Sequence, residues 1–250
     1  MRPLSHHPER QKLSVTGPSF PANLDHLSPL ELLDFYHMKA GVGPSADRYA
    51  AMKQLITLMA RLELCQQQIQ TEKIIKLSRE LTNDDFERLG AKLINRSMTP
   101  YEDATLDQTQ AYIRSITQHL MAESRQRSSQ VQLRTCLQLS ALNRHHPGSM
   151  DDLLIQQTLG IIDDAPAEKS VLIPLAAKLI WNLSTDNSLR YATALYARIP
   201  DREPDNIPVL QALADITEFL PAQPGSQDLI VKIRQHLYRA LINQEAAEAQ

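Results

Sequence analysis

Glycine and cysteine are both scarce in this chain, which has 7 glycines and 2 cysteines among 250 residues. Tight hairpins, phosphate-binding loops and strand bulges depend on glycine, so its scarcity argues against barrels, sandwiches and nucleotide-binding folds. Two cysteines do not make the disulfide framework of a small secreted domain. Both Cys65 and Cys136 fall within apolar helical patterns. We therefore expect two buried, free thiols in a reducing compartment such as the cytoplasm.

Long apolar runs and excess positive charge are also missing. No stretch of roughly 18 apolar residues occurs, so we expect no membrane span. The formal net charge is -3, and neither half of the chain is net positive. A nucleic-acid-binding function is therefore disfavoured, because phosphate backbones are held mainly by clustered cations.

Sequence motifs that carry chemistry are absent as well. The chain has no HExxH, CxxC or GxSxG pattern and no glycine-rich phosphate loop. Each of these places ligands, nucleophiles or backbone amides at the spacing that its chemistry needs. We therefore expect no cofactor and no metal, assign no catalytic residue, and regard an enzyme as the less favoured class.

The sequence does contain helical periodicity from residue 28 onward. Apolar residues recur at spacings of three and four, and proline or hydroxyl residues fall between these segments. The pattern predicts about eleven helices and no strand, hence an all-α domain over residues 28–250. The helices start in pairs about 40 residues apart, a step typical of helical repeats, but no residue signature recurs. Two arrangements stay open, an irregular α-solenoid and a compact multi-helix bundle.

Several helix boundaries can be predicted from local signals. Ser28-Pro29-Leu30-Glu31 is a capping box with proline at the first helical position. Thr99-Pro100-Tyr101-Glu102 repeats that signature, and Ser45 and Asn83 are expected to cap two other helices. Residues 166–184 form the most hydrophobic segment, and Pro174 within it should kink or split the helix.

The first 27 residues differ from the rest of the chain. They contain four prolines and several serines and histidines, and they show no periodic apolar face. They also lack the apolar region of a Sec signal peptide. We expect a disordered N-terminal segment over residues 1–27. A sharper interpretation is an unfolded signal for type III secretion, which would export the protein from a bacterium into a host cell.

Candidate binding residues lie in the C-terminal third. Trp181 is the only tryptophan; we expect it in the core, and it would be the best partner anchor if it were exposed. Arginines and tyrosines on two predicted helices form the nearest approach to a basic, aromatic patch. The partner-binding candidates are Trp181, Arg190, Tyr191, Arg198, Arg234 and Tyr238.

These observations favour a helical protein that binds another protein through its surface, as a secreted effector in virulence or a secretion-associated protein. One alternative is an RNA-binding helical-repeat protein. Another is an enzyme whose site assembles only in three dimensions.

Overall fold

The structure, a computed structural model, describes residues 24, 27–98, 104–143, 148, 150–199 and 206–249. These residues form eleven α-helices, three short 3-10 helices and no strand, which confirms the all-α prediction. The elements are α1 (Pro29–Ala40), α2 (Ser45–Met59), α3 (Leu64–Leu77), η1 (Ser78–Glu80), α4 (Asn83–Ser97), α5 (Leu106–Ser124), α6 (Ser129–Asn143), α7 (Asp151–Asp164), η2 (Pro166–Glu168), α8 (Lys169–Ala177), η3 (Lys178–Asn182), α9 (Thr185–Tyr196), α10 (Ile207–Thr217) and α11 (Ser226–Glu248).

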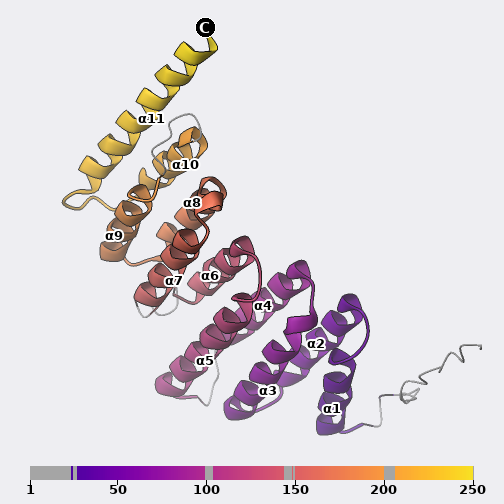
Figure 1. The fold of residues 1–250 in the computed structure, drawn as a ribbon. Coiled ribbons are helices and arrows are strands. Elements are labelled where there is room, and N and C mark those ends of the chain that lie inside the picture. The colour runs from indigo at the N-terminus through magenta and orange to yellow at the C-terminus, as the bar shows by residue number, and fades with distance from the viewer. Residues whose placement is uncertain are drawn as a thin grey trace, which may run out of the picture.

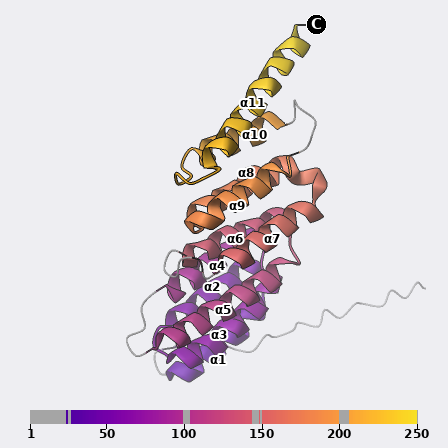
Figure 2. The ribbon, with the colours of Figure 1, turned by 90° about the vertical axis from the view of Figure 1, so that its left-hand side faces the viewer.

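The helices stack in chain order, with α1 at one end and α11 at the other (Figures 1 and 2). Even-numbered helices form one row, in which α2 packs on α4, α4 on α6, α6 on α8 and α8 on α10. Odd-numbered helices lie beside them, with α3 on α5, α7 on α9 and α9 on α11. This packing is consistent with a compact helical bundle, one of the two predicted arrangements.

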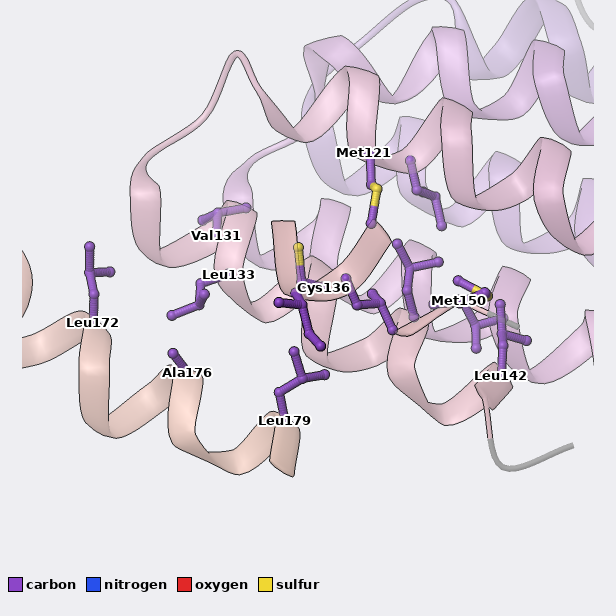
Figure 3. Packing of buried hydrophobic residues seen from close by; sticks show 14 of the residues in the cluster. Met121, Val131, Leu133, Cys136, Leu142, Met150, Leu172, Ala176 and Leu179 are labelled. Atoms are coloured by element: carbon purple, nitrogen blue, oxygen red, sulfur yellow. The ribbon is translucent and has the colours of Figure 1, made fainter. Parts of the chain in front are cut away.

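A continuous hydrophobic core runs between the two rows. Its buried residues come from every α-helix of the described chain, and α6 lies near its middle. Figure 3 shows Val131, Leu133 and Cys136 of α6 close to Leu172 and Ala176 of α8. Since each helix buries an apolar face of its own, the helical periodicity of the sequence is also the pattern of the core.

The predicted helix starts are confirmed only where the signal is complete. At α1 both halves of the capping box form, with the Ser28 amide donating to Glu31 Oε2 at 2.8 Å. Ser45 does not cap α2; its hydroxyl donates to Asp85 and so ties α2 to α4. Thr82, not Asn83, caps α4. The box predicted at residues 99–102 lies outside the described residues, and α5 is capped by Thr105 with Gln108.

Pro174 lies inside α8, and the helix continues through it to Ala177. The segment then tightens into η3, which has the geometry of a 3-10 helix. The hydrophobic segment 166–184 is therefore divided into η2, α8 and η3, but its α-helical part does not break at the proline.

No helix in the described ranges combines the length and the apolar character needed to cross a lipid bilayer. The segment predicted to be disordered, residues 1–27, lies outside the described residues apart from 24 and 27. Its disorder stays a prediction.

The two cysteines differ in their environment, which corrects the expectation that both are buried. Cys65 is exposed at the start of α3, and Cys136 is buried in α6. Burial raises the pKa of the Cys136 thiol to about 11, so almost none of it is thiolate at neutral pH.

We therefore expect a thiol reagent to label the native protein once, at Cys65, and to label Cys136 only after unfolding. Counting labelled thiols by intact mass before and after denaturant checks this. Replacing Cys65 with serine should abolish native-state labelling, and two fast-reacting thiols in the native protein would contradict the burial of Cys136.

Candidate functional site

Two arginines of the predicted basic patch, Arg190 in α9 and Arg198 just after it, are bound to acidic residues of α7. Arg198 makes a bidentate ion pair with Asp163, at 2.8 Å for both nitrogen–oxygen distances. Arg190 pairs with Asp152 near the start of α7. Hydrogen bonding from Arg198 holds the pKa of the Asp163 carboxyl below its ordinary value. These contacts place both arginines between α7 and α9, with their charges already matched.

Tyr191 does not belong to a surface patch. Its side chain is fully buried, and its hydroxyl donates to the Ala176 carbonyl at 3.2 Å, in the last turn of α8. The hydroxyl thus satisfies a carbonyl at a helix end, where intrahelical donors run out. The prediction of Tyr191 as a partner-binding residue is therefore wrong.

The two candidates on α11 are at the surface. Arg234 pairs with Glu218, which follows the last residue of α10. Tyr238, one turn further along α11, is 67% exposed. The structure therefore divides the predicted patch into residues that join α9 to α7 and residues on the outer side of α11.

Trp181 is 58% exposed, which corrects the expectation of a core tryptophan. An α-helical spacing of four would place it on the buried face that contains Ile173 and Ala177. Trp181 instead lies in η3, where residues three apart share a face. Ile180 therefore follows Ala177 into the core, and Trp181 turns outward.

The backbone beside Trp181 is fixed by buried hydrogen bonds to α6. The side-chain amide nitrogen of Asn182 donates to Ser140 Oγ at 2.7 Å, and the backbone carbonyl of Asn182 accepts from Asn143 Nδ2 at 2.9 Å. Ser140 and Asn143 are both buried. The indole is thus presented by a segment that is anchored on its core side.

Asp151 extends this anchor to α9. Its carboxylate is buried and accepts from Asn143, from the backbone amide and hydroxyl of Ser184, and from Asn187 Nδ2 at 2.7 Å. The four donors come from α6, from the residue before α9 and from α9 itself. Burial acts to raise the pKa of the Asp151 carboxyl, but these hydrogen bonds outweigh it and the pKa lies below the ordinary 3.8. The sequence suggested only a helix-start role for this residue.

Trp181 lies at one end of an exposed stripe along α8 and η3. Val171 is exposed, Pro174 is half-buried, and Lys178 is exposed. The spacing of three and four puts Val171, Pro174 and Lys178 on one face of α8, and Lys178 shares a 3-10 face with Trp181. The stripe presents an apolar surface with one cation.

The described residues gather no cluster of metal-ligating side chains. They contain no group of three or more histidine, cysteine or acidic side chains placed to hold a metal ion. A hollow of about 300 Å³ is lined by Arg79, Glu123 and Arg127. In it Arg79 and Glu123 bind each other at 2.7 and 2.8 Å, and Arg127 donates to backbone carbonyls. These charged groups hold the fold together.

Comparison of the chain with protein-family models, curated proteins and solved structures finds no match. The arguments about function therefore depend on the geometry alone.

The exposure of Trp181 predicts a distinctive fluorescence, since it is the chain's only tryptophan. We expect the native emission to be red-shifted toward that of a solvated indole and to be quenched efficiently by acrylamide. A buried indole would emit at shorter wavelength and resist quenching. Comparing the native protein with the unfolded protein, whose indole is fully solvated, gives the reference for both measurements.

Proposed function

We propose that this protein is a helical scaffold that binds another protein, with Trp181 as the central anchor. The observation that supports this is the exposure of Trp181 beside Asn182, whose carbonyl accepts a hydrogen bond from the buried Asn143. Asn143 in turn donates to the buried carboxylate of Asp151. Tryptophans of this kind dominate binding energy at protein interfaces, because a rigid, large ring loses little entropy when it is covered. Lys178 adds a preference for an acidic group beside the apolar segment.

The contacts of the arginines favour protein binding over RNA binding. Arg190 and Arg198 each form an ion pair with an acidic side chain of α7. A strand of RNA would have to compete with these carboxylates for the cations that it needs.

Quantitative affinity capture from cell extract, with the full chain as bait, tests the proposal. Trp181→Ala should weaken retention of a specific partner roughly 30-fold, the effect of losing about 2 kcal/mol at a hot spot. Leu30→Ala is the matched control, because Leu30 is also exposed but lies in α1, at the end of the stack away from α8 (Figure 1). Its bound proteins should equal those of the wild type. Equal retention by wild type and Trp181→Ala would contradict the role of Trp181.

Export from a bacterium remains a separate proposal, supported only by the composition of residues 1–27. Deleting these residues should abolish secretion in a strain with a type III apparatus and leave the thermal unfolding of the helical domain unchanged. Unchanged export would contradict it.

A further inference from the structure

Helix α11 has two apolar faces. Leu229, Ile233 and Ala240 are buried on the inner face, against the rest of the stack. Val231, Tyr238 and Ile242 are all exposed on the opposite side, with Leu241 at its edge. The outer side of α11 therefore carries four exposed apolar residues.

The outer residues of α11 follow the spacing of a helix-pairing seam. Val231, Tyr238 and Glu245 are seven residues apart, and Arg234 and Leu241 lie three residues after the first two. This alternation of three and four is the period at which one helix packs along another. We name the seam by these five residues together with Ile242.

Charge is distributed unequally along the seam. The basic residue Arg234 lies on the N-terminal side of Tyr238, Leu241 and Ile242, and the acidic residue Glu245 lies on their C-terminal side. Both charged residues are exposed. Turning a second copy of the helix end for end places its Glu245 opposite Arg234 and its Arg234 opposite Glu245. The apolar residues then meet between two matched ion pairs.

Arg234 can take part although it already binds Glu218. That contact uses one terminal nitrogen of the guanidinium, which carries five N–H donors in all. The neighbouring cation Arg239 lies three residues before Ile242, about 60° around the axis, so it borders the seam beside that residue.

We propose that two copies of this chain associate through α11, antiparallel, with the seam as a two-fold symmetric interface. The charge order of the seam is complementary to itself when one copy is reversed, which favours a second copy as the occupant. A parallel pair would instead put Arg234 against Arg234 and Glu245 against Glu245. The interface is independent of the Trp181 stripe. Few apolar residues per helix take part, so we expect dissociation on the order of 10 µM.

Sedimentation velocity of the full chain across the micromolar range tests this. The wild type should pass from monomer to dimer, and Tyr238→Glu should stay monomeric. Arg234→Glu alone and Glu245→Arg alone should each weaken dimerisation at least tenfold, since each puts like charges opposite one another. An equimolar mixture of these two single variants should form a heterodimer, because both ion pairs are restored between unlike chains.

Lys232→Glu, at an exposed position with no seam residue three or four away, and Trp181→Ala should dimerise like the wild type. Circular dichroism confirms that every variant is folded. A wild-type chain that stays monomeric throughout, whether or not another protein binds α11, would overturn the proposal. A wild-type dimer whose two charge variants fail to associate on mixing would overturn the antiparallel register.

Discussion

Replacing Asp151 with asparagine is expected to lower the free energy of unfolding by about 3 kcal/mol. The carboxylate only accepts, and it receives donors from Asn143, Ser184 and Asn187. Asparagine has nearly the same shape but would turn an NH₂ group toward these donors. Urea unfolding monitored by circular dichroism measures the loss.

Asp152→Asn is the matched control, because Asp152 is the next residue and its ion pair with Arg190 is exposed on both sides. Exposed pairs contribute little, so this variant should lose less than about 1 kcal/mol. Equal losses in the two variants would show that the buried hydrogen bonds of Asp151 are not the cause.

The same network predicts sensitivity to acid. The folded-state pKa of Asp151 lies below the ordinary 3.8 that applies to the unfolded chain. Its contribution to stability is therefore fully present above pH of about 4 and is lost as the pH falls through the folded-state pKa. The stability difference between wild type and Asp151→Asn should accordingly shrink in acid.

Arg127→Ala is expected to cost about 2 kcal/mol, because Arg127 joins the turn after α5 to the segment between α3 and α4. Its guanidinium donates to the carbonyls of Ser78 and Leu81 at 2.8 and 3.2 Å. The guanidinium carbon lies 4.0 Å from the centre of the buried Phe86 ring. Removing the side chain loses the stacking and both hydrogen bonds, although the Ser78 carbonyl keeps the backbone N–H of Leu81 as a donor.

Arg127→Lys should recover little of that loss, since one ammonium group lacks the planar fork that reaches both carbonyls. Arg125→Ala serves as the control, because Arg125 is exposed and makes a long 3.4 Å hydrogen bond to Gln157. It should change the unfolding free energy by less than about 0.5 kcal/mol. Full recovery by lysine would show that charge alone accounts for the role of Arg127.

Features encoded within a few neighbouring residues could be predicted from the sequence. The capping box of Ser28 and Glu31 spans four residues, and the apolar spacing of each helix spans a few turns. The number of helices and the all-α class follow from such local signals. Ser45 shows their limit, since a hydroxyl at a helix start can bind a distant side chain such as Asp85 instead.

The candidate site depended on features that are not local. The outward position of Trp181 requires the change from α-helix to 3-10 helix after Ala177, which α-helical spacing does not anticipate. The donors to Asp151 lie at positions 143, 184 and 187, and no sequence pattern joins them. The sequence groups Tyr191 with the nearby arginines as a basic, aromatic patch, but its hydroxyl has a partner inside, on α8.

The chain-order stacking of the helices also has a mechanical consequence. Each helix rests mainly on helices close to it in the chain, so a pull on the two ends is passed from one helix pair to the next along the row. Small rotations at several of these junctions would add up along the row, so the separation of α1 and α11 can change while each helix keeps its own hydrogen bonds.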